Sequence, residues 1–104
     1  MTPDTTLKVR LGLVIRRHRE RHGWTQEEFA DATGLHTPYY GGVERGKQNL
    51  TLWNMQRVAA GLDVAVWTLL KEAEQLDLSK ALHQPHKPPR VGRPRGRRSG
   101  YATR

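Results

Sequence analysis

The fold is decided by residues 23–46, which read GWTQEEFADATGLHTPYYGGVERG. Near the start of this stretch, Thr25 is followed three residues later by Glu28, which is the spacing of a capping box. In such a box the threonine hydroxyl accepts a hydrogen bond from the glutamate N–H, and the glutamate carboxylate accepts one from the threonine N–H. This predicts a helix over residues 26–33. It ends at Gly34, because glycine readily adopts the left-handed conformation of a tight turn.

A second short helix is predicted over residues 37–45, directly after the turn. Pro38 is compatible with it, because a proline in the first helical turn loses no hydrogen bond. Gly46 is expected to end the helix. The side chains expected to face inward are Tyr40, Val43 and Glu44. Two short helices joined by a glycine-containing turn are typical of a helix-turn-helix motif, here at about residues 26–45.

Apolar spacing predicts three further helices around this motif. The first precedes it and ends at Gly23, with an inner stripe of Leu7, Leu11, Val14, Ile15 and His18. The next has Thr51 as its expected N-cap and an inner stripe of Leu52, Met55, Val58, Ala59 and Leu62. The last covers about residues 65–78, with a face of Val66, Leu69, Leu70, Ala73 and Leu76. No long stretch alternates with period two, so we predict an all-α, five-helix bundle over residues 7–80.

Charge is unevenly distributed along the chain. Its 104 residues carry 18 lysines and arginines against 10 acidic residues, for a net charge of +8 with neutral histidines. Residues 83–104 contain seven of the basic residues, four prolines and no acid. Such a segment has too few apolar groups to offset the entropy of ordering it. We therefore expect a disordered basic tail at residues 83–104 and a polyanion as the partner.

Several classes of protein are excluded by composition. The chain has no cysteine, so disulfides, thiolate catalysis and Cys-type zinc sites are ruled out. No apolar run is long enough to span a membrane, and the N-terminus has no secretion signal, so we expect a cytoplasmic protein. The histidine pairs lack the further ligands that zinc needs. No catalytic constellation stands out, so we predict neither an enzyme nor a metal or cofactor site.

The order of the motifs resembles that of the Cro/lambda-repressor-like (XRE-type) helix-turn-helix regulators of bacteria and phages. The resemblance is carried by residues 15–30, 34–35, 43–52 and 58–62 and covers roughly residues 9–72. The segment around Glu44-Arg45-Gly46-Lys47 also resembles the controller proteins of restriction–modification systems. The resemblance implies a dimeric transcriptional regulator, a repressor or autoregulator, that binds double-stranded DNA of the nucleoid.

The resemblance also implies roles for individual residues. Phosphate contacts are expected from Gln26, Lys47 and Asn49. Base contacts are expected from the exposed positions of the second motif helix and its start, His36, Thr37, Pro38, Tyr39 and Gly42. A structural ion pair is expected between Arg19 and Glu44. A dimer seam is expected at Trp67, Leu70 and Ala73.

The second motif helix departs from the family pattern. Where the family often has Gln, Arg or Asn, this chain has a threonine, a proline, a tyrosine and a glycine. Few side chains are therefore available to read bases directly. His36 stands where the family has a small capping residue, so we expect Thr37 to cap instead. Gly41 and Gly42 each cost about 1 kcal/mol relative to alanine within a helix. Either the helix becomes fully ordered only when it binds DNA, or the missing side chains allow its backbone to approach the DNA closely.

Two alternatives concern the surfaces outside the motif. Trp67 either belongs to the dimer seam or packs against the first helix. In the tail, Pro94-Arg95-Gly96-Arg97 resembles the core of an AT-hook, which lies in the minor groove of A·T-rich DNA. The arginines expected to contact DNA there are Arg93, Arg95, Arg97 and Arg98. The alternative is a basic tail that adds affinity without reading sequence.

Two other functions remain open from the sequence. The chain is alternatively the DNA-binding antitoxin partner of a toxin, although the tail has few apolar groups with which to hold one. It is alternatively an architectural DNA-binding protein with weak sequence preference. This last possibility is favoured by the basic tail and by the scarcity of base-reading side chains on the second motif helix.

Overall fold

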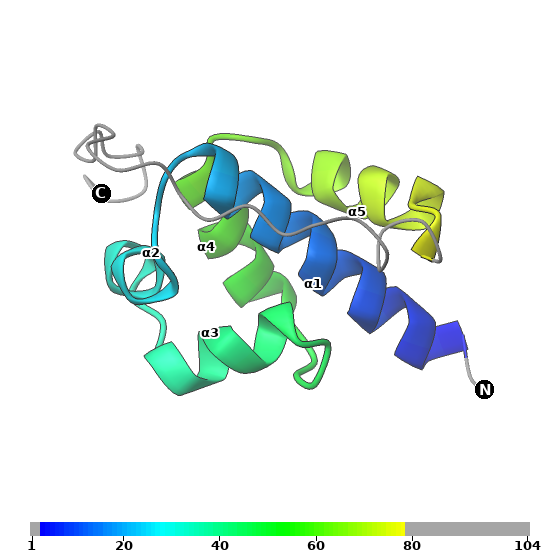
Figure 1. The fold of residues 1–104 in the computed structure, drawn as a ribbon, viewed down its shortest axis with the longest axis horizontal. Helices are drawn as coiled ribbons and strands as arrows, with labels where there is room; N and C mark the ends of the chain where they lie inside the picture. The colour runs from blue at the N-terminus through cyan, green and yellow to red at the C-terminus, as the bar shows by residue number, and fades with distance from the viewer. Residues whose placement is uncertain (1–2, 79–104) are drawn as a thin grey trace.

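The computed structural model describes residues 3–78, and within that range the secondary structure is entirely helical. The five helices are α1 (Pro3–Arg21), α2 (Gln26–Thr33), α3 (Thr37–Glu44), α4 (Leu52–Leu62) and α5 (Val66–Gln75). This confirms the predicted all-α bundle. Figure 1 shows α1 crossing the molecule, with α5 alongside it and α2 and α3 on its other side. No helix in the described range is long and apolar enough to cross a membrane.

The core lies where α1, α4 and α5 meet the motif helices. Its largest fully buried side chains come from all five helices: Tyr40, Phe29, Ile15, Leu62, Leu69, Val58 and Thr33. The predicted inner stripes are confirmed except at Leu52, which is 74% exposed. Leu52 is the first residue of α4, and Leu50 in the preceding loop packs against the core instead. The apolar stripe of α4 therefore begins at Met55.

The caps of α2 and α4 form as the sequence predicts. The Glu28 N–H donates to Thr25 Oγ1 at 3.0 Å, and the Thr25 N–H donates to Glu28 Oε1 at 3.0 Å. Gly34 ends α2 with a φ of 77°, in the left-handed region. Thr51 caps α4 by accepting from the Asn54 N–H at 3.0 Å. These local signals place α2 and the start of α4.

The start of α3 and the end of α5 differ from prediction. The expected cap by Thr37 is wrong, because the Tyr40 N–H already donates to the His36 carbonyl. Thr37 is thus inside the helix, and the N-cap is His36, which makes no capping bond with its side chain. Helix α5 ends at Gln75 because Leu76 takes an extended conformation, with ψ at 130°.

Two glycines bring α1 into backbone contact with the end of α3. A Cβ on Gly12 would lie 2.4 Å from the Val43 carbonyl oxygen and 2.6 Å from that of Glu44. Gly46, with a φ of 73°, lies against the backbone of Val9. Since a carbonyl cannot swing away as a side-chain end can, any larger residue at position 12 pushes the two helices apart.

We therefore expect Gly12→Ala to lower the free energy of unfolding by about 1–3 kcal/mol, as overpacking does. The matched control is Gly41→Ala, whose Cβ would meet only the ends of the Arg45 and Gln26 side chains, at 3.2 and 3.5 Å. This substitution should leave the free energy of unfolding unchanged or raise it by up to about 1 kcal/mol, because alanine has the higher helix propensity. Urea unfolding followed by circular dichroism gives both values. Equal effects of the two substitutions would contradict the close crossing.

Candidate nucleic-acid interface

A buried ion pair fixes the end of α3 against α1. Arg19 Nε donates to Glu44 Oε2 at 2.6 Å, and Arg19 Nη2 donates to Glu44 Oε1 at 3.0 Å. The two side chains are 7% and 2% exposed. Such a forked guanidinium–carboxylate pair is geometrically specific as well as strong. The structure thus brings together the two residues expected to form the structural pair.

Glu44 also receives hydrogen bonds from both motif helices. Gln26 Nε2, at the start of α2, donates to Glu44 Oε1 at 2.8 Å. The Tyr40 hydroxyl of α3 donates to Glu44 Oε2. Arg19 Nη1 meanwhile donates to the Trp24 carbonyl at 2.8 Å, just before α2. One carboxylate therefore joins α1, α2 and α3, and it sets how the two motif helices are oriented.

This network changes the proton affinity of its members. Burial lowers the pKa of Arg19, but the hydrogen bond and the negative charge of Glu44 outweigh it, so the pKa is raised. Burial, the charge of Glu44 and the hydrogen bond to Glu44 together raise the pKa of Tyr40 above its usual value of 10.0. At neutral pH the arginine is therefore charged and the tyrosine neutral, as the geometry requires.

The outer face of α3 presents its first turn to solvent. His36 and Pro38 are exposed, while Thr37 and Tyr39 are half-buried. The expectation that Gly42 is exposed is wrong, because the loop after α3 folds back over it. A Cβ on Gly42 would lie 2.8 Å from Cγ of Gln48, and the Lys47 N–H donates to the Gly42 carbonyl at 2.8 Å.

Tyr39 connects the outer face of α3 to the next two segments. Its hydroxyl donates to the Asn49 carbonyl at 3.3 Å and accepts from Asn54 Nδ2, also at 3.3 Å. Lys47 and Asn49 are both exposed in the same loop. The sequence pattern did not single out Asn54, because its role depends on α4 lying beside α3. The four candidates at residues 36–39 and the loop at residues 47–49 therefore form one connected surface.

Arg45 is a further basic residue of this surface. It is the C-cap of α3 and is exposed. A Cβ on Gly41 would lie 3.2 Å from its Nη1. It lies on the same side of α3 as Gln26, whose Oε1 would be 3.5 Å from that Cβ. The Glu44-Arg45-Gly46-Lys47 run already contained this signal, but the family resemblance implied no role for Arg45. The tail candidates Arg93, Arg95, Arg97 and Arg98 lie outside the described residues.

The expected dimer seam is partly available on the surface. Trp67 is 65% exposed, with Lys71 Nζ 5.8 Å from its ring centroid, so it does not pack inside against α1. Leu70 is half-buried. Ala73 is fully buried, and the expectation that it meets a partner is wrong. It belongs to the core, and α5 lies along α1, where His18 Nε2 is 2.8 Å from Glu72 Oε1.

Comparison with known proteins identifies the family. Residues 15–66, half of the chain, match the family model described as helix-turn-helix, and they contain α2, α3 and the Arg19–Glu44 pair. The chain belongs to this helix-turn-helix family. The match confirms the resemblance to XRE-type regulators.

Individual relatives agree with this assignment. A hypothetical transcription factor of Neisseria meningitidis is 41% identical over 67 residues, which are 64% of this chain and 63% of that protein. The chain thus spans less than two thirds of that relative. The restriction–modification controller protein C.AhdI of Aeromonas hydrophila has a TM-score of 0.57 at 39% identity, covering 59% of this chain and 92% of that one. The biofilm regulator SinR, solved in complex with DNA, has a TM-score of 0.56 at 34% identity, covering 58% and 97%.

The raised pKa of Tyr40 predicts a stability change at alkaline pH. Below about pH 10 the tyrosine is protonated in both states, and its contribution is fully present. As the pH rises, the unfolded chain loses this proton while the folded chain keeps it, so folding stability falls. Between pH 10 and 11 the wild type should lose about 1 kcal/mol more than Tyr40→Phe. Urea unfolding at each pH measures this, and parallel curves would show that Tyr40 ionises in the folded protein.

Proposed function

We propose that this chain is a DNA-binding transcriptional regulator that binds a pseudo-palindromic site as a homodimer and acts as a repressor or autoregulator. The observation that carries the proposal is the Glu44 network, which holds α2 and α3 together while leaving the first turn of α3 open to solvent. Membership of the helix-turn-helix family and the likeness to SinR support it. Such a protein works in the cytoplasm, on DNA of the nucleoid.

In this proposal the phosphate contacts come from two places. Gln26 lies at the start of α2, where backbone N–H groups and the positive end of the helix dipole favour an anion. Its side chain is already oriented by Glu44, so it is held beside α3 before DNA arrives. Lys47 and Asn49 extend the phosphate surface along the loop after α3. The exposed Arg45 lies between these two sets.

Base contacts in this proposal are confined to the start of α3. His36, Thr37 and Pro38 offer ring, hydroxyl and apolar contacts. The hydroxyl of Tyr39 is already bonded to Asn49 and Asn54, so the exposed part of its ring is what it offers to a base. The tail arginines at positions 93, 95, 97 and 98 add charge, either in the minor groove or as a sequence-independent anchor.

The dimer in this proposal forms through α5. Trp67 is a large exposed ring on this helix, and Leu70 is the half-buried apolar residue one turn further on. In a two-fold interface both subunits use the same surface, so one substitution affects the interface twice. The antitoxin and architectural alternatives lack a comparable observation in the described residues.

Substitutions on the two kinds of DNA contact should behave differently. Gln26→Ala should weaken binding to all sequences about equally, since phosphates carry no sequence information. Thr37→Ala should instead relax preference at particular base pairs, by about 1–3 kcal/mol. Titration against single-base variants of an operator measures both, with Gln56→Ala on the exposed face of α4 as the matched control. A uniform loss for Thr37→Ala would remove this residue from base readout.

The dimer seam is tested by Trp67→Glu, which should give a folded monomer that binds a full operator weakly. The loss is expected because a dimer reads half-sites about one helical turn apart together. Trp53→Gln is the control, since Trp53 is equally exposed but lies on α4, and this substitution puts no carboxylate beside Arg57. Sedimentation and circular dichroism report mass and folding. A dimer mass for Trp67→Glu would end the proposal of this seam.

A further inference from the structure

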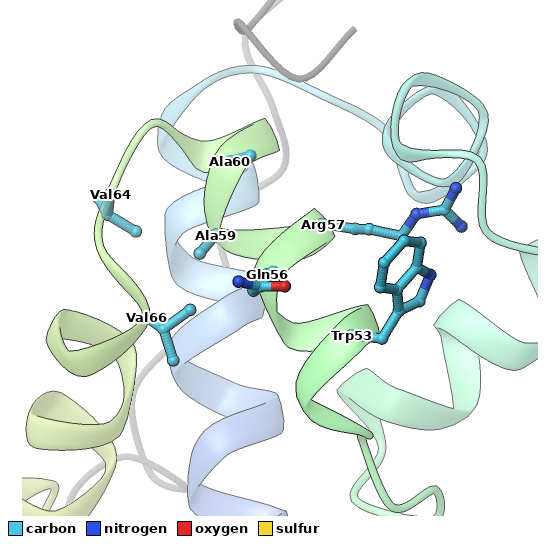
Figure 2. Close-up of a pocket in the computed structure, with 7 residues that line it drawn as sticks. All are labelled: Trp53, Gln56, Arg57, Ala59, Ala60, Val64 and Val66. Atoms are coloured by element: carbon cyan, nitrogen blue, oxygen red, sulfur yellow. The ribbon is translucent and has the colours of Figure 1, made fainter. Parts of the chain in front are cut away.

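A groove runs along the outer face of α4, beside the loop that leads into α5. Figure 2 shows its lining: Trp53, Gln56, Arg57, Ala59, Ala60, Val64 and Val66. Its volume is about 360 Å³. Sites for small organic molecules occupy about 300–1,000 Å³, so the groove has room for a small ligand.

The groove has an apolar floor and one charged end. Two alanines of α4 and two valines around the start of α5 form the floor, and Figure 2 shows Gln56 between them and Trp53. The indole of Trp53 forms a wall although it is 66% exposed, which leaves a large apolar ring in water. Arg57 is the one charged residue among those that line the groove. This combination fits an apolar ligand that carries one negative charge.

Arg57 is positioned both to bind an anion and to change its own contacts when the anion binds. Its guanidinium carbon is 5.7 Å from the Trp53 ring centroid, and Nη1 donates to the Gly34 carbonyl at 3.5 Å. A carboxylate accepts charge-assisted bonds from a guanidinium fork, which are stronger than a long bond to a neutral carbonyl. A bound carboxylate would therefore draw Arg57 away from Gly34.

Such a movement of the Arg57 side chain would affect the proposed DNA surface at Gly34. It ends α2 in the left-handed conformation and begins the turn into α3. A Cβ on Gly34 would lie 3.4–3.7 Å from the guanidinium group of Arg57, so this group covers the turn directly. Drawing Arg57 away would therefore uncover the turn that joins the two motif helices.

We propose that this groove binds a small apolar carboxylate, of the arylacetate type, and that its occupation weakens DNA binding through Arg57 and the Gly34 turn. The first half stands on the groove alone, and the second half rests on the proposed function. The groove is thus an effector site within the helix-turn-helix domain itself.

The binding test uses the full chain labelled with nitrogen-15 and titrated with phenylacetate, with phenylacetamide as the uncharged counterpart. Phenylacetate should shift the indole N–H signal of Trp53 and the amide signals of Ala60 and Val64 until they saturate. Phenylacetamide should bind about tenfold more weakly, because it loses the charge-assisted bond. Shifts that do not saturate, that are equal for both compounds, or that centre on another surface would overturn the site.

Two variants separate the groove from the rest of the molecule. Ala60→Phe fills the floor and keeps Arg57, whereas Arg57→Gln keeps the floor and removes the charge. Both should abolish the preference for phenylacetate, while Lys71→Gln, which removes an exposed charge outside the groove, should retain it. Circular dichroism checks folding, and Arg57→Gln decides the question if Ala60→Phe does not fold. Full binding by a folded variant of either kind would overturn the proposed ligand site.

The regulatory half is tested on DNA. Saturating phenylacetate should weaken operator binding of the wild type by about fivefold or more and leave that of Ala60→Phe unchanged. An unchanged wild-type affinity would overturn the effector role. A ligand-free protein that binds no DNA would contradict the proposed function and, with it, the effector role. The titration separately decides whether the groove holds the carboxylate.

Discussion

The carboxylate of Glu44 is the constraint on which the arrangement of the motif depends. It is 2% exposed and accepts hydrogen bonds from Arg19, Gln26 and Tyr40, which come from three different helices. Removing one partner of such a buried pair typically costs about 3–5 kcal/mol, whereas replacing both with apolar groups is often neutral. Stability alone therefore does not account for the network. Its bonds are directional, and they fix α2 and α3 at the angle that the outer face of α3 requires.

Short helices make this constraint necessary. Helices α2 and α3 have eight residues each, well below the length at which an isolated helix is stable in water. Their stability comes from packing, and the packing is close because Gly12 and Gly46 let α1 touch the end of α3. That contact includes the backbone of Glu44, whose side chain is only 2% exposed. Close packing and the buried charge thus support each other.

The sequence predicts best what local signals decide. The capping box at Thr25 and the left-handed Gly34 place α2 at its observed bounds, because all the atoms involved lie within a few residues. The sequence predicts poorly what depends on a neighbouring segment. Leu52 is exposed because Leu50 replaces it in the core, Ala73 is buried within the core, and Gly42 is covered by the loop that follows it. Of the candidate site, the first turn of α3 and the loop residues could be predicted, but not the link through Asn54.

The covering of Gly42 also bears on how this protein would choose its DNA. The two glycines of helix α3 lie against Gln48, Arg45 and Gln26. Close approach of DNA to the backbone at Gly42 would require the loop after α3 to move, at the cost of the bond from the Lys47 N–H. In the proposed function, base readout would therefore be concentrated at residues 36–39, where bidentate donors are scarce. A regulator with so little direct readout must obtain much of its specificity from the spacing of two half-sites and from the shape of the DNA between them.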